Sequence, residues 1–166
     1  VTFPLDGYDF IWASPPCQDH MRVGQHPTHG TGWMLAKTRE RLENQTTPWV
    51  IENVPGAPLR VDYALCGCMF NLLNLRRERW FEISWPKKLV LLPPHNHEAL
   101  CISVVGHGTP SWGRSKLGRC PTITEYRAAM GIEWMDRNAL SQAIPPPYAE
   151  FIGKQAIQFL QERVSV

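Results

Sequence analysis

The sequence predicts an α/β fold built on a parallel sheet, and three segments carry this prediction. Residues 8–14 (YDFIWAS) form a short apolar run after the turn-forming Asp6-Gly7, as expected for a strand that is buried on both faces. Residues 32–44 place apolar side chains along one helical face and charges opposite. Residues 48–53 (PWVIEN) form a second buried strand. This order of strand, helix and strand, with a short connection from the helix to the second strand, favours a right-handed crossover between parallel strands.

The middle of the chain is less regular. Apolar and polar residues alternate along residues 78–85 (ERWFEISW) well enough to predict a third strand. Residues 86–120 contain the strand-like runs KLVLL and CISVVG among Pro, Gly, Ser and His, which predicts a small β-rich or irregular appendage. Residues 20–32 are polar and rich in glycine, so we expect a mobile loop there.

Two helices are predicted near the C-terminus. Thr122 followed three residues later by Glu125 is a capping-box pattern, and Gly131 marks the end of that helix. A closing helix is expected after the prolines at 145–147. The predicted division is an α/β core (1–86), a small appendage (87–120) and C-terminal helices that return to the core (121–166).

The composition bounds the class of protein. At 166 residues and 43% hydrophobic residues, the chain suits one domain with a small appendage. Five cysteines and no apolar run of about 18 residues favour free thiols in a reducing, cytoplasmic compartment, and exclude a membrane-spanning protein. The net charge is only +2, but residues 76–119 hold eight basic and three acidic residues. That segment predicts a face that can meet a phosphate backbone.

Polar and reactive side chains follow the two predicted parallel strands. Cys17 comes just after the first strand, and Glu52 and Asn53 end the second. Open α/β sheets bind ligands at the carboxyl ends of their strands, so neighbouring strands would bring a thiol, a carboxyl and a carboxamide into one crevice. The alternative is that Cys17 is a small buried hydrophobe and Glu52 a capping acid.

Five sequence blocks together resemble the DNA cytosine C5-methyltransferase family, and they occur in that family's order. The first two are similar to its Pro-Cys-Gln and Glu-Asn-Val motifs, the third to its pair of arginines one residue apart, and the last two to its recognition-supporting helix and C-terminal motif. The blocks are SPPCQ (14–18), IENVPG (51–56), RRERWFE (76–82), ITEYRAAMGI (123–132) and QAIPPPYAEFIGKQ (142–155). The short central region is closest to small phage-type members with roles such as restriction-modification.

The resemblance implies a partial Rossmann-like, S-adenosylmethionine-dependent methyltransferase fold whose first strands are missing. It implies that Cys17 adds to C6 of a flipped-out cytosine so that C5 can accept a methyl group. Glu52 would hold the N3 and N4 edge of the base, and Arg79 would donate to O2. Arg77 would brace the Cys17 loop, and Asn53 would orient it.

The resemblance also assigns binding residues for S-adenosylmethionine and for duplex DNA. The cofactor residues would be Pro16, Gln142 and Ala143. The DNA-binding residues would be Gln18, Arg76, Arg114, Lys116, Arg119 and Arg127. The setting would be the cytoplasm of a bacterium or of a phage-infected host.

The chain departs from the family pattern in several places. Leu75 stands where the family usually has Gln, and Ser141-Gln142 stand where it usually has Gly-Asn. The resemblance makes residues 1–86 the catalytic core and residues 87–120 the target-recognition region. This region is short, which predicts a short or relaxed target site. The family's N-terminal glycine-rich cofactor loop has no counterpart, so we expect an upstream segment or a second chain to supply the cofactor half. The alternatives are a non-catalytic DNA-binding remnant or subunit, and methylation of a free cytosine nucleotide.

No metal site is predicted. The residues Cys66, Cys68, Cys101, Cys120, His95 and His97 could form a zinc site in the appendage. Their spacing matches no recognised finger or ribbon, and Cys-x-Cys is a poor chelate without two more fixed ligands. Free thiols are the favoured interpretation.

Overall fold

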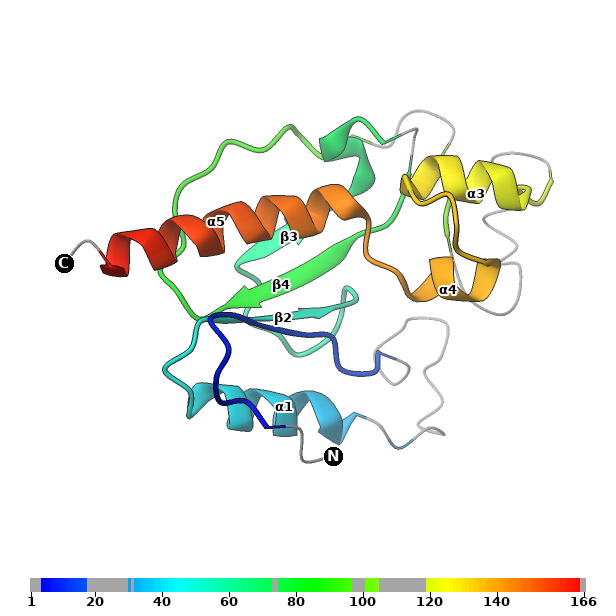
Figure 1. Cartoon of the computed structure of the whole chain (residues 1–166). Helices are drawn as coiled ribbons and strands as arrows, with labels where there is room; N and C mark the ends of the chain where they lie inside the picture. Colours follow the sequence, from blue (N-terminus) through cyan, green and yellow to red (C-terminus); the bar gives the residue numbers. More distant parts are fainter. Residues whose placement is uncertain are drawn as a thin grey trace. The chain divides into compact units, whose positions relative to one another are not determined.

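The computed structural model describes residues 4–17, 30, 32–72, 75–96, 101–104 and 119–164. Over these residues the protein is a mixed α/β structure with a four-stranded mixed sheet and four α-helices (Figure 1). The strand order is β1-β2-β4-β3. The α/β class predicted from the sequence is therefore confirmed. The described residues divide into two compact units.

The first unit comprises the described residues within Val1–Ala64, Arg79–Leu89 and Ala156–Val166. It begins with β1 (Ile11–Ala13), α1 (Trp33–Glu43) and β2 (Trp49–Asn53). β1 and β2 pair in parallel, with Ile11 opposite Trp49 and Ala13 opposite Ile51. The predicted strand, helix and parallel strand are thus present, although β1 is shorter than the apolar run suggested.

The sheet is completed by β3 (Tyr63–Leu65) and β4 (Arg79–Ile83). β4 lies between β2 and β3 and runs antiparallel to β2, with Glu52 opposite Phe81. The sequence predicted β4 as a strand but gave no direction for it, and β3 was not predicted. A run of three residues is too short to show an alternating pattern, and strand direction depends on the pairing partner.

Helices lie on both faces of this sheet. Figure 1 shows α1 on one face and the C-terminal part of α5 (Pro146–Val164) on the other. On the α1 face, Leu42 packs with Trp49 and Ile51 in a buried cluster. On the α5 face, the Phe159 ring stacks on Trp85 with 6.3 Å between the ring centroids. β2 is buried along its whole length, as expected for a strand that is covered on both faces.

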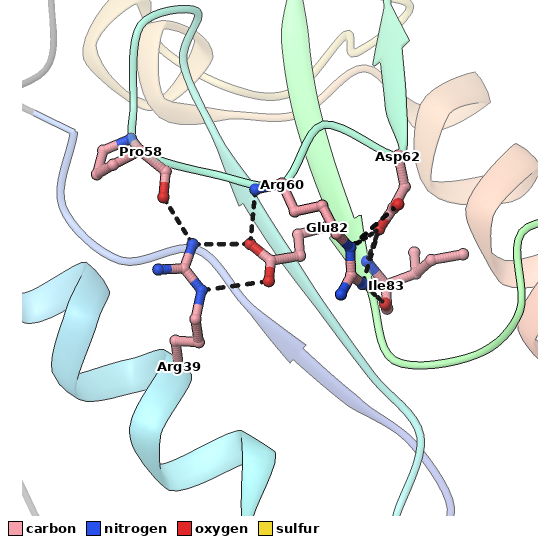
Figure 2. Close-up of polar contacts among 6 residues, drawn as sticks. All are labelled: Arg39, Pro58, Arg60, Asp62, Glu82 and Ile83. Carbon is pink, nitrogen blue, oxygen red and sulfur yellow. Dashed lines mark hydrogen bonds and ion pairs between the residues drawn. The ribbon is translucent and has the colours of Figure 1, made fainter.

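A polar network joins α1 to β4 and to the segment before β3 (Figure 2). The guanidinium of Arg39 donates to both carboxylate oxygens of Glu82, at 3.2 and 2.7 Å, and to the carbonyl of Pro58 at 2.7 Å. The backbone N–H of Arg60 donates to the same carboxylate at 3.1 Å, and the Arg60 side chain pairs with Asp62. Glu82 is only 3% exposed, so these donors replace the water it loses on burial.

The second unit comprises the described residues within Leu65–Glu78 and Val90–Gln155. Its helical elements are the 3-10 turn η2 (Gly67–Phe70), α3 (Ile123–Met130), α4 (Arg137–Gln142) and the first part of α5. Its core includes Leu75, Tyr126, Met130 and Leu140, all nearly or fully buried. α4 was not predicted, because six residues give too little periodicity to identify a helix.

The ends of α3 follow the sequence prediction. The Thr122 hydroxyl accepts a hydrogen bond from the Glu125 backbone N–H at 3.2 Å, and the Glu125 carboxylate accepts one from the Thr122 N–H at 2.7 Å. Gly131 ends the helix with a φ of 68°. The capping box and the glycine stop are therefore both confirmed.

The strand-like run KLVLL does not form a strand. Residues 86–96 have no regular secondary structure, and Leu89 and Leu91 are 94% and 93% exposed. Proline at 86, 93 and 94 brackets the run, and proline cannot donate to a strand ladder. In the run CISVVG, Ile102 forms one isolated bridge with Leu75. The expected mobile loop at 20–32 lies outside the described residues except for two glycines.

Within the described residues, no helix has both the length and the apolar character needed to cross a bilayer.

Candidate active site

The carboxyl ends of β1 and β2 lie side by side because the strands are parallel neighbours. Asn53 is 1% exposed and uses both ends of its carboxamide at this point. Its Nδ2 donates to the carbonyl of Pro15 at 3.0 Å, and its Oδ1 accepts from the N–H of Val54 at 2.9 Å. Asn53 therefore ties the end of β2 to the segment that leads to Cys17.

Cys17 follows this anchored peptide by two residues. Its side chain is partly buried, and no disulfide involves it or any of the other four cysteines, all of which lie in the described part of the chain. A thiol at this place combines access with a fixed backbone, which is what a nucleophilic cysteine needs. The next predicted contact residue, Gln18, lies outside the described residues.

Glu52 and Arg79 form an ion pair beside these strand ends. Arg79 Nε lies 2.9 Å from Glu52 Oε1, and the two side chains are only 14% and 9% exposed. The pairing follows from the sheet register, since Glu52 lies opposite Phe81 and Arg79 is two residues from Phe81 on the same face. The sheet thus places the Glu52 carboxylate, an acceptor, next to the Arg79 guanidinium, a donor, and both are largely shielded from solvent.

Arg77 lies in the second unit and is 4% exposed. Its guanidinium donates to the carbonyls of Val104 at 2.7 Å, Ser141 at 2.8 Å and Ala143 at 2.7 Å. The Tyr148 hydroxyl donates to the Arg77 carbonyl at 2.7 Å. Arg77 therefore fixes the C-terminal end of α4, and its predicted role in bracing the Cys17 loop stays a prediction.

The predicted cofactor residues fall in different units. Gln142 and Ala143 lie at the end of α4 in the second unit. Pro16 lies in the first unit and lines a cavity of about 620 Å³ between β1 and α1. The described residues that line it are Leu5, Tyr8, Phe10, Ile11, Trp12, Ala13, Pro15, Pro16, Trp33, Met34, Lys37, Thr38, Arg41 and Leu42.

This cavity meets only part of what S-adenosylmethionine needs. Its apolar and aromatic walls suit an adenine ring. Among the lining residues, however, no carboxylate is present to accept hydrogen bonds from a ribose, and the charged side chains, Lys37 and Arg41, are both cationic and would repel a sulfonium. The described lining of this cavity is therefore not a complete cofactor site.

The predicted DNA-binding residues have varied surroundings. Arg76 is exposed. Arg119 is also exposed but pairs with Glu125 through two contacts of 2.8 and 2.5 Å, and this pairing lowers the pKa of the Glu125 carboxyl to about 2. Arg127 donates from Nε to the Met135 carbonyl at 2.9 Å, which fixes the chain after α3. Arg114 and Lys116 lie outside the described residues.

Sequence reasoning missed two features of the first unit. The cavity was not foreseen, because Trp12 and Trp33 are 21 residues apart and neither occurs in a motif. The buried pair of Arg39 and Glu82 was also missed, because Arg39 sits among the charged residues that an amphipathic helix is expected to expose. Glu82 gave no signal either, because it alternates with Phe81 and Ile83 and so falls on the face opposite these apolar residues of the predicted strand.

No protein-family model matches the chain, and no curated protein matches it either.

Proposed function

We propose that this chain carries the catalytic half of a DNA cytosine C5-methyltransferase with a Rossmann-like core. The observation that supports it most is the Glu52–Arg79 pair, which stands beside the strand ends from which Cys17 follows. The resemblance of five ordered sequence blocks to that family is independent support. The parallel pair β1 and β2 with α1 between them is consistent with such a core.

In this proposal Cys17 acts as the nucleophile. Its thiolate forms an Sγ–C6 bond, and the electron pair of the C5–C6 double bond moves to C5. C5 then takes an electrophile. In full turnover this would be the methyl group of S-adenosylmethionine, whose S–CH3 bond breaks and leaves S-adenosylhomocysteine, and without a bound methyl donor it is a proton from water. Loss of the original C5 proton to a base restores the double bond and breaks the Sγ–C6 bond. Cysteine suits this step because its thiolate is both a good nucleophile and a good leaving group.

The Glu52–Arg79 pair matches the edge of cytosine. The base presents O2 as an acceptor, and it presents N4–H as a donor next to N3, which becomes basic as the adduct forms. Arg79 would donate to O2, and Glu52 would accept from N4 and stabilise a proton on N3. Their low exposure strengthens both interactions relative to water. A uracil, whose N3 and O4 reverse this pattern, would pair poorly with Glu52.

The acceptor in this proposal is duplex DNA. Attack on C6 needs access to the face of the ring, so the cytosine must leave the base stack, at a cost of a few kcal/mol. Phosphate contacts would repay that cost, and the net positive segment 76–119 is their source. Because Arg119 is already paired with Glu125, we expect Arg76 to contribute more to DNA affinity than Arg119 does.

The methyl donor in this proposal is S-adenosylmethionine, bound with the help of protein outside these 166 residues. β1 is an edge of the described sheet and is apolar, and the described residues that line the cavity beside it include no acid for the ribose. A further parallel strand next to β1 would extend the sheet and bring a carboxylate to the cavity. An upstream segment of the same chain and a second chain are both compatible with this arrangement.

The nucleophile can be tested without the methyl donor. Reversible addition of Cys17 to C6 should release tritium from duplex DNA that contains [5-³H]cytosine. We expect Cys17→Ser to abolish this release, whereas Cys120→Ser, which changes an exposed cysteine of the second unit, should leave it unchanged. Release by Cys17→Ser at the wild-type rate would overturn the assignment.

The same assay examines the base-binding pair. We expect Glu52→Gln to lower exchange at least about 100-fold, because the adduct loses its charged partner, while DNA affinity changes little. Glu40→Gln is the matched control, since Glu40 is exposed and pairs only with Lys37 among the bonds described. DNA binding by the wild type without any exchange would favour a non-catalytic remnant. Exchange with free dCMP as fast as with duplex would favour a nucleotide substrate.

A further inference from the structure

A second group of reactive side chains, none of which has a role in the proposed reaction, lies in the second unit. Cys66, Cys68 and His95 each place one ligand atom so that all three atoms lie within 4.8 Å of one another. The two cysteines flank Gly67 at the start of η2, and His95 comes from the irregular segment 86–96. Segments almost 30 residues apart in the chain therefore converge on one point.

The Cys66-Gly67-Cys68 turn is held rigidly. A Cβ on Gly67 would lie 2.5 Å from the carbonyl oxygen of Leu75 and 2.6 Å from its Cβ, so only glycine allows this packing. Leu75 is fully buried and is itself held by its bridge to Ile102. The turn therefore presents both sulfur atoms from a fixed backbone, which reduces the entropy lost when a ligand binds.

The group also combines burial with access. Cys66 is fully buried, Cys68 is partly exposed and His95 is exposed, so an ion can enter from the His95 side. In a tetrahedral zinc centre the ligand atoms are about 3.5–3.8 Å apart, given Zn–S and Zn–N bonds of about 2.3 and 2.0 Å. Because the three ligand atoms lie within 4.8 Å of one another, each separation has to shorten by at most about 1.3 Å to reach that spacing.

We propose that Cys66, Cys68 and His95 bind a Zn²⁺ ion that fastens the segment around His95 to the η2 turn. Two thiolates and an imidazole are ligands that favour zinc over the hard cations Mg²⁺ and Ca²⁺. Binding exchanges each S–H bond for an S–Zn bond and releases the proton to solvent. Burial raises the pKa of the Cys66 thiol to about 11, so the ion must displace that proton.

The three ligands leave a fourth position on the ion. No other Cys, His, Asp or Glu of the described residues belongs to the group, so this position is left to water or to a further ligand. Cys101 and Cys120 occur in the same unit but outside the group. The site departs from our sequence-based expectation, because the sequence offered the Cys-x-Cys pair but no means of placing His95 beside it.

The test is metal content and affinity of the whole chain purified under reducing conditions. We expect about one equivalent of zinc by mass spectrometry, and thiolate-to-metal charge-transfer absorption when Co²⁺ replaces it. Cys68→Ser and His95→Gln should each weaken zinc binding at least about tenfold in a chelator competition. These two changes avoid the fully buried Cys66, so the variants should still fold, and circular dichroism will verify this.

One matched control defines the result. Cys120→Ser removes an exposed thiol outside the group, and it should leave the zinc affinity unchanged. The proposal is overturned if the wild type binds no zinc, or if His95→Gln binds as tightly as the wild type. A disulfide between Cys66 and Cys68 that persists after purification under reducing conditions, detected by thiol counting, would also contradict the proposal.

Discussion

Arg39 and Glu82 lie 43 residues apart in the chain but form a largely buried ion pair on the α1 face of the sheet. Glu82 is almost fully buried, and both of its oxygens are bonded, to Arg39 and to the Arg60 N–H. Replacing such a pair by apolar side chains can be neutral, but removing one partner leaves an uncompensated charge in a medium of low polarity. The pair therefore fixes where α1 sits on the sheet more than it adds net stability.

A substitution on α1 tests this. We expect Arg39→Met to lower the free energy of unfolding by about 3–5 kcal/mol, because Glu82 loses its charged partner while it stays buried. Lys37→Met is the control on the same helix, since Lys37 pairs with the exposed Glu40, and it should change stability by less than about 0.5 kcal/mol. Urea unfolding measures both, and equal effects would show that burial of Glu82 is unimportant.

At the same scale, single residues differ in how far the sequence revealed them. Cys17, Glu52 and Asn53 were identifiable because each follows or ends an apolar strand and occurs within a motif. The resemblance assigned Glu52 and Arg79 to the same base, but it did not predict their ion pair, since that contact depends on β4 pairing antiparallel to β2. Side-chain contacts across strands are set by register, which local sequence patterns do not encode.

Among the secondary-structure elements, those with strong local signals were predicted and short ones were not. α1, α3 and α5 show helical periodicity or caps, so their presence is decided largely by nearby residues. β3 and α4 have three and six residues and form where neighbouring elements provide partners. KLVLL shows the converse, because apolar, strand-like residues remain irregular where prolines remove backbone donors.

Substitution of two glycines can test how far local backbone conformation decides the helices. Gly131 ends α3 at a φ of 68°, where a Cβ would meet no atom within 4 Å but would strain the backbone. Gly153 lies inside α5, also with open space around a Cβ. We expect Gly131→Ala to destabilise the protein by about 1 kcal/mol and Gly153→Ala to stabilise it by about 0.5–1 kcal/mol. Thermal denaturation will compare them, and shifts of the same sign would contradict the backbone argument.

At the scale of the whole molecule, the edge of the described sheet bears on the proposed cofactor. β1 is at that edge, and the described residues that line the cavity beside it provide apolar walls and two cations but no acid. These residues by themselves offer no carboxylate to a ribose, and their two cations disfavour a sulfonium.

Calorimetry tests this conclusion. We expect no saturable heat when S-adenosylmethionine is titrated into the 166-residue chain at concentrations up to roughly the millimolar range. A parallel titration with S-adenosylhomocysteine, which lacks the sulfonium charge, separates two causes of weak binding. Binding of S-adenosylhomocysteine alone would indicate repulsion of the sulfonium by Lys37 and Arg41, whereas binding of neither compound would indicate missing ribose contacts. Tight binding of S-adenosylmethionine to the chain alone would show that these residues contain a complete cofactor site.

The sequence by itself determined the α/β class, the parallel strand pair with its helix, the ends of α3 and the candidate nucleophile. Each depends on residues close together in the chain, whose apolar period, caps or turns favour one local structure. Only the tertiary structure decided the place and direction of β4, the burial of Arg39 with Glu82, the cavity beside β1 and the meeting of His95 with Cys66 and Cys68. These contacts join distant segments, and their geometry is fixed by packing and strand register.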